Sequence, residues 1–298
     1  MRTLMCAAVL AVASVQQAYA WGPEGHSIIA EIAQREVKPE TRSAIDRILH
    51  HGTLAAVASW ADDAKFTPPW QYTYDWHFVD IPLSHDTYAP LDCKPKHDAT
   101  KPDACLISAL TQLKTELACA TDERTRRNLL RLVVHLIGDS AQPLHTVDDL
   151  TGGNDLMVTA AFCGLTGGPS CTPPANPPTI KFHVVWDSTL ITETVFDWGA
   201  YVDRLYDPQQ GWLNSDQARG PDPGSDTLIG WINDTHAQAE IVWTKLLPAN
   251  HVLDQDYYNK VLPILDRQLG LGGLRLARFL DAVFAPGACR APGNGGVP

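Results

Sequence analysis

The sequence predicts a single-domain, all-α protein, and three observations lead to this prediction. Apolar residues recur at helical spacing in several long segments, and strand-like alternation of apolar and polar residues is scarce. Proline and glycine are concentrated in the segments 66–104, 151–180 and 207–224, which we interpret as loops between helices. Hydrophobic residues make up 45% of the 298-residue chain, and no linker-like change in composition divides it, which favours one large globular domain.

The expected helices follow the apolar repeats in chain order. In each repeat, a spacing of three or four residues places the apolar side chains on one helical face, which can pack against a core. The helix that contains Leu129 is expected to end near Ser140, because Pro143 cannot continue it. The six repeats comprise Ile28, Ile29, Ile32 and Ala33; Ile45, Ile48 and Leu49; Leu106, Leu110, Leu113 and Leu117; Leu129, Leu132, Val133, Leu136 and Ile137; Leu228, Trp231, Ile232, Thr235, Ala239 and Val242; and the run from Leu271 to Phe284.

Residues 1–20 have the features of a cleavable export signal peptide. Arg2 supplies the basic start, the run from Leu4 to Ser14 is a short apolar core, and the segment 18–20 is a small-x-small cleavage site. The core is shorter than the roughly 20 apolar residues that span a bilayer, and no later segment approaches that length. We therefore expect a secreted or periplasmic protein without a membrane anchor, whose mature N-terminus is Trp21.

The charge and the cysteines of the mature chain agree with this location. Residues 1–20 contain only Arg2 among charged residues, so 22 basic and 34 acidic side chains remain, a formal charge of −12. Such a chain binds polyanions poorly unless bound cations reverse the local field. Six cysteines remain, which predicts three disulfides with 15 possible connectivities, of which we name only Cys163 with Cys171. We expect a catalytic domain over residues 21–288 and a disordered tail over 289–298.

Histidine and aspartate residues form a set that is typical of a metal site. His135 and Asp139 are four residues apart on an expected helix, and His183 and Asp187 repeat this spacing, so each pair lies on one helical face. His145 follows the proline that ends the first of these helices and can turn back toward the same place. The nine expected ligand positions are Trp21, His26, Asp62, His77, His135, Asp139, His145, His183 and Asp187.

The composition of this set favours hydrolytic metal ions. The free amine and carbonyl oxygen of Trp21 can chelate a metal beside His26, and imidazole and carboxylate bind zinc at about 2.0–2.2 Å. Nine ligands are too many for one zinc ion, and cysteine is absent from the set, which argues against structural zinc fingers. A single His/Asp pair at this spacing is more often a surface or hydrogen-bonded pair, but two pairs and a processed terminus together favour a metal centre. The histidines without a partner motif are interpreted as structural or surface residues: His50, His51, His85, His97, His236 and His251.

The chain resembles the S1/P1 nucleases (nuclease I), a family of secreted trinuclear zinc enzymes, in a series of motifs between residues 21 and 187: WGPEGH, SWADD, WHFVD, VHLIGDSAQPLHTVDD, GGND and FHVVWD. The resemblance implies a helical fold, shared with zinc phospholipases C, with three zinc ions in a cleft. It implies that one ion is held by Asp62, His77, His135 and Asp139. The second is held by His26, Asp139 and the amine and carbonyl of Trp21, and the third by His145, His183 and Asp187.

The resemblance also implies an activity and a set of substrates. The expected activity is hydrolysis of RNA and single-stranded DNA to 5′-phosphorylated products, with 3′-nucleotidase activity, while preference for duplex DNA stays open. Two zinc ions that share Asp139 would activate a water molecule, and the third would stabilise charge on the departing oxygen. Asp62, Lys65 and Asp139 are the expected catalytic residues, and no side-chain nucleophile is required. We expect the enzyme to be a monomer.

Four residues are expected to bind the substrate. Lys65 matches a family position that points at the scissile phosphate, although a lysine considered alone would more often lie at the surface. Phe78 and Asp80 match a nucleobase site, where the ring stacks on the base and the carboxylate accepts from its edge. Asn154 is expected to line the same pocket. The segment 155–182 is longer than we judge usual for the family, so we expect it to border the cleft and to affect specificity.

A secreted zinc-dependent phospholipase C is the alternative enzyme. In those enzymes a longer segment separates the terminal tryptophan from the first histidine, and the last motif is His-x-x-x-Glu. Here four residues separate Trp21 from His26, and the last acid is Asp187, so both features favour the nuclease. A non-catalytic zinc-binding or interaction protein is the third interpretation.

Overall fold

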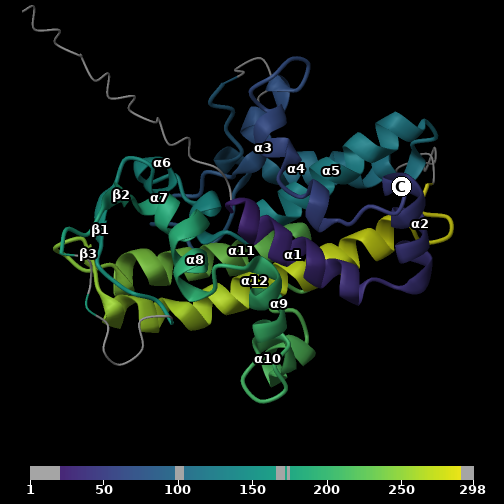
Figure 1. Ribbon diagram of the computed structural model, residues 1–298. Helices are drawn as coiled ribbons and strands as arrows, with labels where there is room; N and C mark the ends of the chain where they lie inside the picture. Colours follow the sequence, from purple (N-terminus) through teal and green to yellow (C-terminus); the bar gives the residue numbers. More distant parts are fainter. Residues whose placement is uncertain (1–20, 98–103, 166–171, 173–174, 290–298) are drawn as a thin grey trace, which may run out of the picture.

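The computed structural model describes residues 21–97, 104–165, 172 and 175–289. Helices dominate this part of the chain and form one domain, as expected (Figure 1). The α-helices are α1 (Pro23–Glu36), α2 (Pro39–Leu49), α3 (Trp60–Ala64), α4 (Leu106–Cys119), α5 (Glu123–Asp139), α6 (Leu150–Gly153), α7 (Phe182–Val184), α8 (Leu190–Thr194), α9 (Trp198–Leu205), α10 (Asp216–Arg219), α11 (Leu228–Glu240) and α12 (Gln255–Val283).

Several shorter or wider helical turns connect these helices. The 3₁₀ turns are η1 (Ala55–Val57), η2 (Gln71–His77), η3 (Pro90–Asp92), η4 (Pro143–Thr146) and η7 (Trp212–Asn214). Two further turns, η6 (Val185–Thr189) and η8 (Ile241–Leu246), are π-helical.

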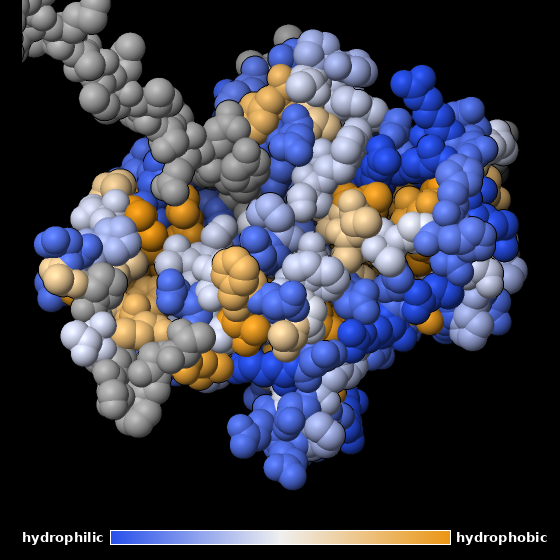
Figure 2. All heavy atoms as spheres, in the orientation of Figure 1, coloured by the Kyte–Doolittle hydropathy of each residue, from blue (hydrophilic) through white to orange (hydrophobic). Residues whose placement is uncertain are grey.

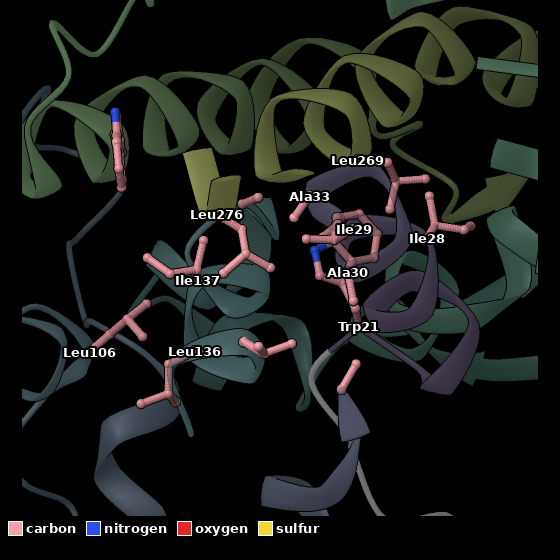
Figure 3. Close-up of a cluster of buried hydrophobic side chains, with 14 of the residues drawn as sticks. Trp21, Ile28, Ile29, Ala30, Ala33, Leu106, Leu136, Ile137, Leu269 and Leu276 are labelled. Carbon is pink, nitrogen blue, oxygen red and sulfur yellow. The ribbon is translucent and has the colours of Figure 1, made fainter. Parts of the chain in front are cut away.

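The long helix α12 runs through the middle of the molecule, and α1 lies along it (Figure 1). Gly273 permits this close approach, because a β-carbon there would lie 2.4 Å from a methyl carbon of Ile32. Side chains from α1, α5 and α12, among them Ile29, Ile137 and Leu276, form a common buried cluster (Figure 3). Each such side chain contributes about 1.5–3 kcal/mol on burial, so this cluster fixes the position of α5 relative to α1.

All six expected helices are present, but the last is longer than the apolar repeat indicates. It begins at Gln255 and contains Pro263, whereas the recognised repeat begins only at Leu271. The short helices α9 and α10 were not expected from the sequence, and α10 lies in a segment that we interpreted as a loop.

A small three-stranded sheet interrupts the helical architecture. Strand β1 (Met157–Ala160) pairs with β2 (Thr179–Lys181) in antiparallel orientation and with β3 (Val252–Leu253) in parallel orientation. The expectation of irregular structure throughout 151–180 is therefore corrected. Strands of two to four residues are too short to produce a recognisable alternation of apolar and polar residues.

Two disulfides are complete within the described residues. One joins Cys93 to Cys105, and the other joins Cys119 at the end of α4 to Cys289 beyond α12. By the chain-entropy account, a loop as long as the second one stabilises the fold by about 5 kcal/mol. Cys163 is also disulfide-bonded, while its expected partner Cys171 lies outside the described residues.

Two other sequence-based expectations lie outside the described residues, namely the signal peptide at 1–20 and the tail at 290–298. None of the helices in the part of the chain that the structure describes is long and apolar enough to cross a membrane. Figure 2 shows mainly hydrophilic residues over the end of the molecule that contains α2.

Candidate active site

The C-terminal half of α5 carries the central residues of the candidate site. Asp122 caps the start of α5 by accepting a hydrogen bond from the Thr125 amide, and the helix ends at Asp139, close to the expected end. His135 and Asp139 are fully buried, and His135 Nε2 lies 3.3 Å from Asp139 Oδ2. The spacing of four residues thus places both side chains on one face, as predicted.

Residues from three other elements surround the Asp139 carboxylate. His26 of α1 places Nε2 3.3 Å from Asp139 Oδ1, and His77 of η2 places Nδ1 3.0 Å from Asp139 Oδ2. Asp62 of α3 completes the group, with Oδ1 3.4 Å from His135 Nε2 and 3.8 Å from His77 Nδ1. Five of the expected ligands, separated by up to 113 positions in sequence, therefore meet at one point.

A second cluster forms where η4, α7 and η6 meet. His183 Nε2 lies 3.2 Å from His145 Nε2 and 3.5 Å from Asp187 Oδ2. The turn that carries Asp187 is π-helical instead of α-helical, yet the spacing of four residues still brings the two side chains together. Three buried groups of side chains with ligand atoms within 4.8 Å of one another result: His26, Asp62 and His135; His77, His135 and Asp139; and His145, His183 and Asp187.

Trp21 lies two residues before the start of α1 and is completely buried. The next residue, Gly22, donates a backbone hydrogen bond of 2.7 Å to the carbonyl oxygen of Asp187. The Gly22 carbonyl accepts from the His26 amide at 3.2 Å. The backbone around Trp21 is therefore held between two of the expected ligands.

The buried polar atoms at the centre of these groups indicate whether metal ions can bind there. Within the described part of the chain, both ring nitrogens of His26, Nε2 of His77, both oxygens of Asp139 and Oδ2 of Asp187 have no hydrogen-bond partner. Each unsatisfied buried group costs about 1–3 kcal/mol, so such a concentration requires another ligand. Imidazole nitrogens and carboxylate oxygens without cysteine are a donor set that fits divalent ions used in hydrolysis.

Backbone carbonyls fix the orientation of three histidines. Their Nδ1 atoms lie 2.6–2.8 Å from the carbonyl oxygens of Gly152, His77 and Ala58. A carbonyl oxygen can only accept, so Nδ1 carries the proton and Nε2 presents a lone pair to the centre, the tautomer that metal binding requires. The three histidines oriented in this way are His183, His145 and His135.

The electrostatic environment keeps three of the histidines neutral. Burial, reinforced by the charge of His135, lowers the pKa of His26 to about 4. Burial also lowers the pKa of His77 to about 3, together with the charge of Lys65, and that of His183 to about 3. Neutral imidazole is the form that binds metal.

His135 behaves differently because it lies between two carboxylates. Burial opposes its charge, but Asp139 and Asp62 outweigh this effect and raise the pKa of His135 to about 10. The two carboxylates therefore attract positive charge to this position, which a metal cation can supply in place of the proton.

A pocket beside the two clusters brings together all four expected substrate residues. Lys65 is buried and donates to Asp62 Oδ1 at 2.7 Å. Phe78, Asp80 and Asn154 line the same pocket, together with the expected ligands His77, His145 and His183. Asp80 Oδ2 and Asn154 Oδ1 are buried and have no hydrogen-bond partner among the described residues. The pocket therefore offers a cation and two acceptors beside an aromatic ring.

The comparison with known sequences now decides the family. A sequence model described as S1/P1 Nuclease matches residues 21–285. The chain belongs to the S1/P1 nuclease family. Nuclease S1 of Aspergillus oryzae is 29% identical to it over 298 residues, an alignment that covers 93% of this chain and 96% of that protein. Endonuclease 4 of Arabidopsis thaliana is 27% identical, with 91% of each chain covered, and Nuclease P1 of Penicillium citrinum is 27% identical, with 88% and 97% covered.

Membership of this family makes the protein a nuclease, a hydrolase that acts on phosphodiester bonds. The alternative of a phospholipase C is not favoured, because the matching family model and these relatives are nucleases.

In this S1/P1 nuclease, a tight turn supports both the pocket and the second ligand cluster. Thr151 and Gly152 have φ values of 55° and 59°, in the left-handed region. A β-carbon at Gly152 would lie 2.6 Å from the Leu144 carbonyl oxygen, so only glycine fits there. The Gly152 carbonyl orients His183, and Asn154 follows immediately at the pocket wall.

Lys96 and His97 are among the pocket-wall residues that sequence analysis of the nuclease missed. Lys96 Nζ lies 2.8 Å from Asp80 Oδ1 and 5.3 Å from the centre of the Phe78 ring. His97, which we interpreted as structural or surface, also lines the pocket, with its Nδ1 2.9 Å from Asp75 Oδ1. Both lie in a loop without periodicity, so the sequence contains no signal that pairs them with these aspartates. Burial, only partly offset by Lys96, raises the pKa of Asp80 to about 6.

Two further residues position expected ligands. Gln142 Nε2 donates to Asp187 Oδ1 at 2.6 Å and so orients an expected ligand 45 residues away. Gly138 contacts His26, because a β-carbon at this position would lie 2.6 Å from His26 Nδ1. Both residues stand inside the motif VHLIGDSAQPLHTVDD, which is the only sequence signal that marks them. Asp63, by contrast, is exposed.

Proposed function

We propose that this S1/P1 nuclease is an exported, zinc-dependent endonuclease. It cuts RNA and single-stranded DNA to 5′-phosphorylated products and removes the 3′-phosphate from mononucleotides. The observation that carries the proposal is the set of three buried ligand groups beside a pocket that contains Lys65, Phe78 and Asp80. The names of the relatives, Nuclease S1, Nuclease P1 and Endonuclease 4, support nucleic acid as the substrate.

We assign three zinc ions to the nine ligand positions. Asp62, His77, His135 and Asp139 would hold one ion. His26 and Asp139, with the amine and carbonyl of Trp21, would hold a second, and His145, His183 and Asp187 a third. The ligand groups support this division, although His26 also lies near Asp62 and His135. When bound, the ions would supply the positive charge that activates water and stabilises phosphate oxygens.

The protein residues of the pocket would bind and orient the nucleotide. Lys65 is a buried cation that donates to Asp62, and it can hold a non-bridging oxygen of the scissile phosphate. Phe78 can stack on the base, an interaction worth about 1–3 kcal/mol that tolerates every base. The unpartnered oxygens of Asp80 and Asn154 can accept hydrogen bonds from N–H groups at the base edge. These residues thus place the phosphate near the ligand groups. They do not select for a particular base sequence in the substrate.

Export and processing form part of the proposal. The family match begins at residue 21, the first residue after the expected signal peptide. The disulfides Cys93–Cys105 and Cys119–Cys289 suit an oxidising compartment. We take residues 21–288 as the catalytic domain and residues 289–298 as its tail. One chain supplies every proposed ligand, which supports action as a monomer.

An Asp139→Asn variant tests the proposed function. The variant should lose hydrolysis of RNA, single-stranded DNA and 3′-nucleotides together, because all three reactions use one centre. Elemental analysis of the wild-type protein should find three zinc ions per chain. Asp63→Asn is the matched control, since Asp63 is exposed and should leave activity unchanged. At most one tightly bound metal in an active preparation, or near wild-type activity of the Asp139→Asn variant on any substrate, would overturn the proposal.

A further inference from the structure

A groove outside the cleft lies along the N-terminal half of α5. Arg124, Arg127 and Arg131 are three or four residues apart, so their side chains share one face of the helix. This face forms one wall of a groove of about 490 Å³, and the other wall comes from α3 and the segment after it. We call it the α5 groove, and its lining residues are Trp60, Pro69, Trp70, Arg124, Thr125, Arg127, Asn128 and Arg131.

Aromatic rings and guanidinium groups are interleaved in the α5 groove. The Arg131 guanidinium carbon lies 5.3 Å from the centre of the Trp60 ring. Trp60 meets Trp70 edge to face at 5.1 Å, and Trp70 stacks against Tyr72 at 6.2 Å. Both tryptophans are half-buried, and Tyr72 is 40% exposed. Such a combination of aromatic platforms and cations is typical of surfaces that bind single-stranded nucleic acid.

The arginines of the groove differ in how far their charge is already compensated. Arg127 pairs with Glu123 at 2.9 Å and donates to the Ile48 carbonyl of α2. Arg124 and Arg131 have no carboxylate within ion-pair distance in the part of the chain that the structure describes. Asp122 interacts electrostatically with Arg124 without forming an ion pair. In a chain with a formal charge of −11, two arginines without an ion-pair partner among the described residues favour an anionic partner on this face. The groove lies at the α2 end of the molecule, where hydrophilic residues dominate the face in Figure 2.

The two helices that line the α5 groove also carry residues of the ligand clusters. The face of α5 that carries Arg131 continues to His135 and Asp139 in steps of four residues. Trp60 begins α3, which also carries Asp62 and leads to Lys65. Figure 1 shows α3 and α5 side by side. Arg124 lies eleven residues from His135, or about 16 Å along the helix, which roughly five stacked nucleotides would span.

We propose that the α5 groove binds the part of a single-stranded substrate that extends beyond the cleft. Arg124 and Arg131 contact phosphates of the strand, and Trp70 stacks on one of its bases. This inference rests on the proposed function, because the occupant is the strand that the cleft cuts. The groove therefore increases affinity for long strands and leaves mononucleotides unaffected.

Single-stranded thymidine oligonucleotides from a dinucleotide to a dodecamer test this proposal. For the wild type, kcat/KM should rise with length until the strand reaches Arg124, at about five or six nucleotides. In an Arg124→Gln/Arg131→Gln variant, this increase of kcat/KM with strand length should disappear. The slope of log KM for the dodecamer against log salt concentration should fall by about 1.4, which is about 0.7 for each of the two lost phosphate contacts. Trp70→Ala should raise KM for the dodecamer at least about fivefold, as loss of one stacked base predicts. Arg219→Gln, an exposed arginine on α10, is the matched control and should reproduce the wild type.

Turnover of the dinucleotide and of a 3′-nucleotide reports on the cleft alone. If the wild type hydrolyses neither, the proposed function is wrong. If it hydrolyses both, and the variants keep the wild-type length profile and salt slope, the α5 groove proposal is overturned. If the double variant also loses dinucleotide turnover, the length profile and salt slope of the single Arg124→Gln variant decide whether the proposal stands, since Arg124 is exposed. A salt slope reduced only for duplex DNA would overturn the assignment to single strands.

Discussion

Replacing Gly138 by alanine tests whether the close approach of α1 and α5 determines metal binding. A β-carbon at this position would lie 2.6 Å from His26 Nδ1, which is 0.8 Å less than the 3.4 Å at which ordinary contact begins. The His26 ring also stacks on His135, with ring centres 3.9 Å apart, which limits how far the ring can move. Metal–ligand distances tolerate only about 0.2 Å, so His26 should leave the ligand set.

The effect on the fold should be small compared with the effect on the site. Overpacking costs about 1–3 kcal/mol, while alanine favours a helix over glycine by about 1 kcal/mol. The free energy of unfolding should therefore fall by no more than about 2 kcal/mol. Zinc content should fall by about one ion per chain, and turnover of a 3′-nucleotide by at least about 100-fold, at the upper end of the range for misplaced ligands.

Elemental analysis after dialysis, urea unfolding and steady-state kinetics measure these three quantities. Gly199→Ala in α9 is the matched control, because a β-carbon there would approach only Asp197 Oδ1, at 3.1 Å. Full zinc content and wild-type turnover in Gly138→Ala would refute the reasoning, since they would show that His26 is either free to move or not a ligand.

The remaining predictions concern other parts of the site. Gln142→Leu removes the amide that donates to Asp187, so the third ion should bind about 10 to 100 times more weakly. A chelator competition measures this affinity, and an unchanged value would exclude an orienting role for Gln142. The pKa of Asp80 is raised to about 6, so the stability that its protonated form contributes is complete below about pH 4 and is lost as the pH rises through 6. The free energy of unfolding of Asp80→Asn should therefore equal that of the wild type near pH 4 and exceed it by up to about 3 kcal/mol at pH 7. The variant should also have a higher KM for nucleotides. A difference in the free energy of unfolding that stays constant with pH would contradict this prediction. One additional residue before Trp21 should remove about one zinc ion and lower kcat more than it raises KM, and equal zinc and turnover in the extended and processed forms would show that the amine is not a ligand.

Local sequence patterns were sufficient to predict the main helices and to select the candidate ligand residues. The apolar repeat and Pro143 placed the end of α5 correctly, and spacing of four residues placed His135 beside Asp139. The family resemblance then grouped residues from distant segments, and the structure brings the expected side-chain ligands together in two adjoining clusters.

Features that depend on contacts between distant segments were not predicted. The disulfide from Cys119 to Cys289 closes 170 residues, and spacing alone cannot select it among 15 connectivities. Lys96 became part of the pocket only through its contact with Asp80 across a loop. The first half of α12 was missed because Pro263 lies inside it and is ordinarily a helix-ending signal.

The pairing of β1 with β2 makes the positions of the expected ligands independent of the segment that joins these two strands. Met157 lies opposite Lys181, and the Phe182 amide donates to the Leu156 carbonyl at 2.8 Å. The strands therefore hold the pocket wall and the second ligand cluster together whatever length of chain connects them. Doubling a flexible connection costs only about 0.6 kcal/mol in closure entropy. An insertion between β1 and β2 should therefore leave the pocket wall and the second ligand cluster in place, which makes this connection the position to choose for grafting a peptide epitope.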